Sequence, residues 1–185
     1  MRIVGGKHKG LALASPKTSA VRPTSDRTRE ALFNILAHGV EDFELEGARV
    51  LDLFAGTGAL GLEALSRDAR YCLFIDEAAS SRALIRKNVE AMGAMGHSKI
   101  WRRDATRLGK IENMPPFNLV FADPPYGKGL GEKALRSALD NAWLSEQAIC
   151  VLEEATKSEI GPIDGLTEMG RRTYGDTQLI ICRRT

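Results

Sequence analysis

The amino-acid sequence predicts an α/β fold in which helices cover both faces of a mostly parallel sheet. From residue 49 to residue 153, short apolar runs alternate with segments whose apolar residues recur at helical spacing. Strands this apolar are typical of a parallel sheet that is buried on both faces. A glycine-rich loop follows the first run, and two final runs joined by Gly175-Asp176 predict a C-terminal antiparallel hairpin.

The composition fits a globular protein. The chain has 185 residues, which fits one domain or one domain with a small appendage, and 43% of them are hydrophobic, so it can bury a sizeable core. No apolar run approaches the roughly 18 residues that a membrane-spanning helix needs, and the opening segment MRIVGGKHKG lacks the hydrophobic stretch of a signal peptide. We therefore expect a cytoplasmic protein.

The first part of the chain is expected to form a basic arm. Residues 1–24 are rich in Gly, Lys, Ser, Thr and Pro, and Leu11 and Leu13 alternate with smaller residues as in a short hairpin. Residues 25–185 are assigned to the main domain. Its first helix is predicted over residues 25–38, where apolar residues recur every three or four positions and a glycine follows.

The strands and helices of the main domain then follow in order. Apolar runs bounded by turn residues predict strands at residues 49–53, 71–76, 99–102, 118–122 and 148–153. The tail differs: segments 166–174 and 177–183, joined by Gly175-Asp176, predict the two strands of the terminal hairpin. Helical spacing predicts helices at residues 58–67, 79–95 and 131–143. Strands separated in this way by helices imply a parallel sheet.

Charge is distributed unevenly along the chain. Residues 1–29 carry seven Lys or Arg against one acid, a net charge of +6, whereas the other 156 residues carry 19 bases and 23 acids, a net charge of −4. A basic segment on an acidic body is typical of a protein whose arm meets a polyanion. The alternative is a solvated tail that serves only solubility.

The cysteines and histidines do not predict a metal site. Cys72, Cys150 and Cys182 are odd in number and widely spaced, and each lies in an apolar run, so we expect reduced core residues. The three histidines are equally scattered, and no pair has metal-ligand spacing.

The glycine loop indicates a bound ligand. Gly56, Gly58 and Gly61 match the pattern G-x-G-x-x-G at the start of a helix, where glycines let a ligand approach the backbone. Asp52 stands just before the loop, where it would repel the pyrophosphate of NAD. The amino group and sulfonium of S-adenosylmethionine suit an acid there. An NAD-binding protein remains an alternative, although the chain has no room for a substrate domain.

Two further acids follow the next strands. Asp76 stands 18 residues after Gly58 and is expected to accept hydrogen bonds from ribose hydroxyls. Asp104 follows the third strand and could accept one from an adenine amino group. Each acid alone could be a turn or cap residue. Three acids at the ends of successive strands favour a cofactor site at that edge of the sheet.

The stretch FADPPYG, residues 121–127, ends the fourth core strand. With it, the chain resembles the class I, Rossmann-like methyltransferases that use S-adenosylmethionine to modify exocyclic amino groups. It looks most like the bacterial 16S ribosomal RNA guanine-N2 methyltransferases of the RsmD type, named for guanine 966 of that RNA. The resemblance covers nearly the whole chain, and the arginine-rich segment RPTSDRTREALFN before the glycine loop points to this family within the superfamily.

The resemblance implies a sheet of order 3-2-1-4-5-7-6 with strand 7 antiparallel. It also implies transfer of a methyl group from S-adenosylmethionine to guanine N2 of 16S ribosomal RNA, in the small ribosomal subunit or its assembly intermediate. Asp123 and the carbonyl of Pro124 would accept hydrogen bonds from the guanine amine. The two prolines would hold these acceptors rigid. The ring of Tyr126, and not its hydroxyl, would matter by stacking on the extruded base.

The predicted site residues fall into three groups. The predicted catalytic residues are Asp123, Pro124, Pro125 and Tyr126. The predicted cofactor-binding residues are Asp52, Phe54, Gly56, Thr57, Gly58, Asp76, Glu77, Asp104 and Ala105. The predicted RNA contacts are Lys7, Lys9, Arg22, Arg27 and Arg29. We expect a monomer that needs no metal.

Besides the NAD-binding protein, three alternatives remain open at this point. DNA methyltransferases acting on adenine N6 or cytosine N4 share the motif but usually need a target-recognition domain, and fewer than 50 residues precede the first core strand. Protein glutamine methyltransferases typically carry Asn in place of Asp123. A nucleic-acid-binding module with a degenerate cofactor pocket is the third. The sequence does not decide between naked RNA and an assembled particle, although the lack of a separate RNA-binding domain favours the particle.

Overall fold

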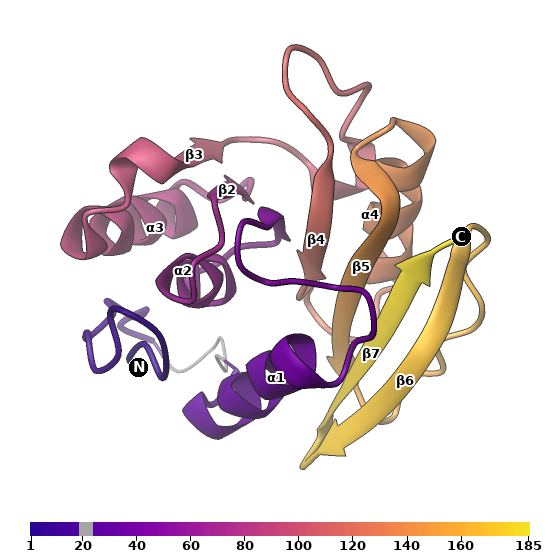
Figure 1. Cartoon of the computed structure of the whole chain (residues 1–185), viewed down its shortest axis with the longest axis horizontal. Coiled ribbons are helices and arrows are strands. Elements are labelled where there is room, and N and C mark those ends of the chain that lie inside the picture. The colour runs from indigo at the N-terminus through magenta and orange to yellow at the C-terminus, as the bar shows by residue number, and fades with distance from the viewer. Residues whose placement is uncertain (19–23) are drawn as a thin grey trace.

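A seven-stranded sheet with the strand order β3-β2-β1-β4-β5-β7-β6 runs through the protein (Figure 1). The computed structural model describes residues 1–18 and 24–185. The strands are β1 (Arg49–Leu53), β2 (Tyr71–Ile75), β3 (Ser98–Trp101), β4 (Phe117–Ala122), β5 (Leu144–Ala155), β6 (Leu166–Tyr174) and β7 (Thr177–Arg184). The first five pair in parallel, and β7 is antiparallel to both β5 and β6. The predicted order and C-terminal hairpin are confirmed.

Helices lie on both faces of this sheet, as predicted (Figure 1). The helices are α1 (Asp26–His38), α2 (Ala59–Ser66), α3 (Ala79–Met92) and α4 (Leu130–Asp140), with short 3₁₀ turns η1 (Met95–His97) and η2 (Ala105–Arg107). One hydrophobic cluster joins α1, α2 and α3 to one face, and a second joins α4 and η2 to the other. Because the strands are buried from both sides, their side chains alternate between the two clusters: Val50 of β1 faces the first, and Leu51 and Leu53 face the second.

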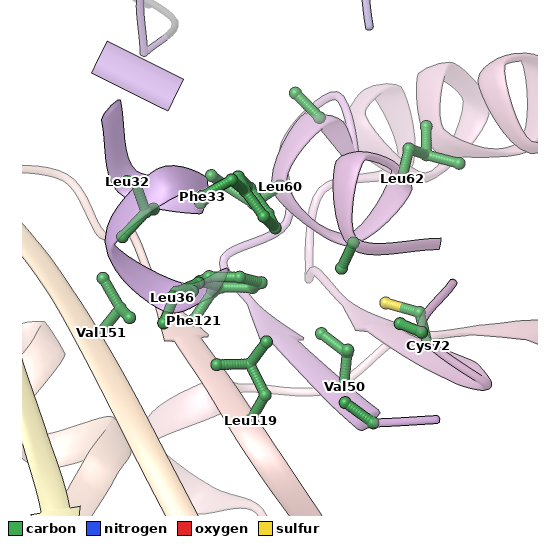
Figure 2. Packing of buried hydrophobic residues seen from close by; sticks show 14 of the residues in the cluster. Leu32, Phe33, Leu36, Val50, Leu60, Leu62, Cys72, Leu119, Phe121 and Val151 are labelled. Atoms are coloured by element: carbon green, nitrogen blue, oxygen red, sulfur yellow. The ribbon is translucent and has the colours of Figure 1, made fainter. Parts of the chain in front are cut away.

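The contact between α1 and the sheet shows how the first cluster is packed. Figure 2 shows Leu32, Phe33 and Leu36 of α1 beside Phe121 of β4 and Val151 of β5. The rings of Phe33 and Phe121 tilt against each other with their centroids 5.7 Å apart. The helix begins at an N-cap, Ser25, whose side chain accepts from the backbone N–H of residue 28. The predicted helix over residues 25–38 is confirmed.

The first 18 residues pack against the domain. An antiparallel bridge joins Arg2 to Ala12, which confirms the short hairpin predicted there. Ile3 is fully buried in the first cluster, and the backbone N–H of Val4 donates to Glu63 Oε2 of α2 at 3.0 Å. The N–H of Ala14 donates to a side chain of α3. The hairpin therefore shares the core of the domain, and a boundary at residue 24 stays a prediction.

Some boundaries differ from the predictions for local reasons. The helix predicted to reach residue 95 ends at Met92, because Gly93 adopts a left-handed φ of 69° that terminates it. The helix predicted to reach Trp143 ends at Asp140. Trp143 turns into the second cluster, where its indole N–H donates to the carbonyl of Gly109 at 2.7 Å.

Candidate active site

A cavity of about 680 Å³ opens at the carboxyl ends of the parallel strands, where the strand order reverses at β1 and β4. Most of the predicted cofactor and catalytic residues line it: Phe54, Gly56, Asp76, Glu77, Ala105, Asp123, Pro124, Pro125 and Tyr126. A second cavity of about 130 Å³ shares Phe54, Gly56, Ser81 and Asp123 with the first, and adds Asp52, Thr57 and Thr24. The two cavities therefore form one site at the predicted edge of the sheet.

The glycine loop forms one wall of the site. Gly56 and Gly58 have left-handed φ angles of 60° and 80°, which side-chain-bearing residues rarely adopt. The N–H of Gly56 donates to Asp76 Oδ2 at 2.9 Å, and the N–H of Ala78 donates to Oδ1 at 2.9 Å. These bonds fix the carboxylate at the wall of the larger cavity. Each of its oxygens can accept a second hydrogen bond, so Asp76 can still receive a pair of hydroxyls.

Gly61, the third glycine of the pattern, serves packing. A Cβ at this position would lie 2.5 Å from Sγ of Cys72 and 2.5 Å from the ring of Phe74. Helix α2 therefore lies directly on the sheet. This close approach also lets the N–H of Gly61 donate to Asp52 Oδ2 at 3.0 Å.

Asp52 lies at the buried end of the smaller cavity. The residue is only 1% exposed, and burial raises the pKa of its carboxyl group to about 8, with a further contribution from the charge of Asp76 and partial relief from the Gly61 hydrogen bond. Phe54, which lines both cavities, holds a φ of 56° that is strained for a bulky residue. A cation placed beside Asp52 would favour its ionised form.

The Asp-Pro-Pro-Tyr turn forms the opposite wall. Asp123 follows β4 directly and is half-buried, Pro124 is buried, and Pro125 is exposed. Tyr126 is 40% exposed, so part of its ring is open to a ligand at the mouth of the site. Burial, followed by the charges of Glu153 and Asp52, raises the pKa of the Asp123 carboxyl well above its ordinary value.

Glu153, near the end of β5, is a site residue that the sequence analysis missed. Its Oε1 accepts from the hydroxyl of Tyr126 at 2.6 Å, and its Oε2 accepts from the hydroxyl of Thr24 at 2.7 Å. The Tyr126 hydroxyl also lies 3.1 Å from Oγ1 of Thr177, so it has a role that the sequence did not predict. Two consecutive acids ending a buried strand, Glu153 and Glu154, were the available signal.

The third strand contributes differently from the prediction. Asp104 does not line either cavity; its Oδ1 caps η2 by accepting from the N–H and the hydroxyl of Thr106 at 2.9 and 2.7 Å, which lowers its pKa. The cap alternative therefore describes this acid. The neighbouring Arg103 and Ala105 line the larger cavity instead. The guanidinium carbon of Arg103 lies 4.9 Å from the ring centroid of Trp101.

The electrostatic character of the site is acidic among the described residues that face it. The cavities are lined by the acidic side chains Asp52, Asp76, Glu77 and Asp123 and by the basic Arg103, and Glu153 accepts a hydrogen bond from Tyr126 at the same site. Such a cluster suits a ligand that carries net positive charge.

The predicted RNA contacts divide in the structure. Lys9 and Arg27 are exposed, and exposed Lys7 forms a surface ion pair of 2.6 Å with Asp68. Arg22 lies outside the described residues.

Arg29 is fully buried, which corrects the expectation that it contacts RNA. Its guanidinium forms ion pairs with Asp26 at 2.9 Å and with Glu63 at 3.5 Å, and it donates to the carbonyl of Thr24 at 3.3 Å. These contacts join α1 to α2 and to the segment before α1. We therefore assign Arg29 to the structure of the domain.

The cysteines are buried and free, as predicted. Across the ranges 1–18 and 24–185, no group of three or more His, Cys, Asp or Glu side chains has the arrangement of a metal site. No helix within those ranges has the length and apolarity to cross a membrane.

Comparisons with known proteins agree with this geometry. A family profile described as "Conserved hypothetical protein 95" matches residues 1–183. The chain is 40% identical over 159 residues to ribosomal RNA small subunit methyltransferase D of Escherichia coli, across 85% of this chain and 76% of the relative. The protein of the same name from Haemophilus influenzae is 33% identical over 178 residues, across 95% of this chain and 89% of the relative. A solved structure from Escherichia coli described as a methyltransferase superposes with a TM-score of 0.83 at 32% identity, and the match covers 100% of this chain and 97% of that one.

Proposed function

The chain belongs to the family described as Conserved hypothetical protein 95, together with the ribosomal RNA small subunit methyltransferases D, and from this we propose its reaction. It transfers the methyl group of S-adenosylmethionine to the exocyclic N2 of a guanine, guanine 966, in 16S ribosomal RNA. The single observation that carries the proposal is the placement of Asp123 and Tyr126 across one cavity from Asp76 and the glycine loop.

The residues present fit S-adenosylmethionine. When bound, this cofactor supplies an electrophilic methyl group on a sulfonium. Asp76, held by two backbone N–H groups, would receive the ribose hydroxyls, and Asp52 would face the amino group. Phe54 and Ala105 offer apolar surface to the adenine, and Glu77 is exposed at the rim of the cavity. The acidic cluster matches the net positive charge of the cofactor.

The Asp-Pro-Pro-Tyr turn is proposed to activate the guanine. The N2 lone pair is delocalised into the ring, so the amine is a poor nucleophile. Asp123 would accept one N–H of the amine and the carbonyl of Pro124 the other, which draws electron density toward the nitrogen and aligns it with the methyl group. Because proline fixes φ, these acceptors are held in place before the base arrives. The exposed face of Tyr126 would stack on the base, an interaction worth about 1–3 kcal/mol.

Asp123 is also suited to accept the proton that the reaction releases. Transfer of the methyl group from the cofactor to N2 would leave N2 cationic, so the amine would have to release a proton. The amine then gives one proton to the Asp123 carboxylate. Burial and neighbouring acids raise the pKa of this carboxylate, which makes it a stronger proton acceptor than an exposed aspartate.

The substrate is proposed to be the small ribosomal subunit or its assembly intermediate, reached by a monomer in the cytoplasm. The exposed side chains of Lys9 and Arg27 would contact phosphates. Lys7 would do the same after leaving its surface ion pair with Asp68. The described part of the chain is built on one sheet, so selection of the guanine would depend on the shape of the particle.

Transfer of a labelled methyl group from S-adenosylmethionine tests the proposal. The acceptors are small subunits assembled without the modification, naked 16S ribosomal RNA, duplex DNA and bulk protein, with Asp123→Ala as the inactive control and the exposed Glu112→Gln as the matched active control. Label on guanine N2 of the RNA or the particle is the expected result. Label on DNA alone, or transfer by Asp123→Ala at the normal rate, would contradict the proposal.

A further inference from the structure

Glu153 occupies a position that the established family membership does not explain. It lies near the end of β5 and is 4% exposed, yet it carries a carboxylate inside a strand whose preceding residues are apolar. A buried carboxylate is unfavourable unless its oxygens accept hydrogen bonds. Both oxygens of Glu153 do so, and both donors are hydroxyl groups at the active site, Tyr126 and Thr24.

We propose that Glu153 is a positioning residue for methyl transfer, which holds the Tyr126 hydroxyl with one carboxylate oxygen and the Thr24 hydroxyl with the other. The proposal rests on the proposed function, because it assigns Glu153 to the same reaction. Glu153 would not touch the base or the cofactor.

Strand register places the two carboxylates together. Ala122 of β4 pairs in parallel with Leu152 of β5, so the next residue on each strand, Asp123 and Glu153, meet at the same edge of the sheet. Thr24, which Glu153 holds, lines the smaller cavity together with Asp123. Glu153 therefore connects the segment before α1 to the Asp-Pro-Pro-Tyr turn.

The neighbouring Glu154 holds the same turn by its backbone. Its Oε1 accepts from the N–H of Gly127 at 2.9 Å and from its own strand at Ala155 at 2.8 Å. Consecutive acids thus fix both sides of residue 126: Glu153 holds the side chain, and Glu154 holds the backbone that follows. The ring that receives the base is constrained at its hydroxyl end and at its main chain.

The charge of Glu153 also acts on Asp123. The titratable groups that face Asp123 are Asp52 from β1, Glu153 and Glu154 from β5, and Tyr126 from its own turn. All of the three carboxylates disfavour the ionised form of Asp123, and Glu153 contributes most among them. Removing the charge of Glu153 lowers the pKa of Asp123, so Asp123 then ionises at lower pH.

Glu153→Gln tests this role, because glutamine keeps the shape but removes the charge and one acceptor. We expect the single-turnover rate of methyl transfer to fall by about 10- to 100-fold with little change in the KM for S-adenosylmethionine. In a plot of rate against pH, the rise on the acidic side should move to lower pH. Methyl transfer needs ionised Asp123, and in the variant Asp123 ionises at lower pH. Tyr126→Phe, which removes one donor and keeps the ring, should lose less. Glu112→Gln should behave as wild type.

A titration without RNA separates this proposal from the proposed function. Carboxyl ¹³C resonances of the full chain report the titration midpoint of Asp123 in the wild type and in Glu153→Gln. The expected midpoint is lower in the variant, because the charge of Glu153 disfavours ionised Asp123. An unchanged midpoint, or a rate that falls equally at every pH, would overturn the role of Glu153. Absence of any methyl transfer by the wild type would instead overturn the proposed function, while the titration still decides the coupling.

Discussion

Ionisation of Asp52 should couple cofactor binding to pH. The carboxyl group of Asp52 has a pKa of about 8 in the unliganded protein because it is buried. At pH 7 only about a tenth of the molecules would then carry the charge on Asp52. Ionising Asp52 at this pH costs about 1.4 kcal/mol of the binding free energy, which lowers the affinity for the cofactor about tenfold. If the amino group of S-adenosylmethionine binds the charged form, the Kd should fall about tenfold between pH 6 and pH 7.

Isothermal titration calorimetry measures both parts of this prediction. At pH 7, in two buffers of different ionisation enthalpy, binding should release close to one proton for each cofactor. The range below pH 7 is chosen because the cofactor's own amino group stays mostly protonated there. S-adenosylhomocysteine keeps that amino group and should release the proton as well. Methylthioadenosine lacks it and should release none.

Asp52→Asn is the matched variant. Its side-chain carbonyl can still accept from the N–H of Gly61, so the packing of α2 is retained, but no proton remains to be released. We expect weaker binding that is independent of pH between 6 and 7. Proton release by Asp52→Asn equal to that of the wild type, or a wild-type Kd that does not change with pH, would refute the ionisation of Asp52 on binding.

Three further predictions concern turnover, packing and RNA contacts. Asp123→Ala should leave the affinity for S-adenosylmethionine nearly unchanged and lower turnover by about 100-fold or more, which is about 2.7 kcal/mol on the barrier; normal single-turnover rates would exclude the assigned role. Gly61→Ala should lower the free energy of unfolding, measured in urea, by about 1–3 kcal/mol, because its Cβ has no space beside the sheet. The control Gly96→Ala should be neutral, because its Cβ meets nothing within 4 Å. Equal urea midpoints of unfolding for the two variants would contradict this account. Replacing Lys7 and Lys9 together by Ala should reduce the salt dependence of RNA affinity, log K against log salt, by about 2 in slope without unfolding the hairpin; an unchanged slope would show that the hairpin does not touch phosphate.

The fold was predictable because its local patterns agree with its packing. Strand β1 has the predicted bounds, since its apolar residues Val50, Leu51 and Leu53 stand between Gly47 and the glycine loop. The hairpin of β6 and β7 was equally evident from Gly175-Asp176. Strand β5 was predicted as residues 148–153 but extends over Leu144–Ala155. Its first residues are partly exposed, and Gln147 has a φ of 59°, so periodicity does not reveal them.

The site was only partly predictable, because several of its side chains depend on distant partners. Glu153 is held by hydroxyls 27 and 129 residues away in the sequence, and no local pattern connects them. Arg29 was expected to contact RNA because it lies on the polar face of the predicted helix, but Glu63 from α2 makes its burial possible. The role of Asp104 as a cap of η2 was local and was among the alternatives, since Asp is a preferred N-cap residue.

The contact of Arg103 with Trp101 gives the protein an optical signal of its own. The chain has two tryptophans, and the indole rings of Trp101 and Trp143 meet edge to face with centroids 6.2 Å apart. The guanidinium of Arg103 lies against both, 4.9 and 5.9 Å from the ring centroids, and the same residue lines the larger cavity. A ligand that displaces Arg103 must change the surroundings of both indoles together. Occupancy of the site should therefore be readable from intrinsic fluorescence, without a label and before any RNA is added.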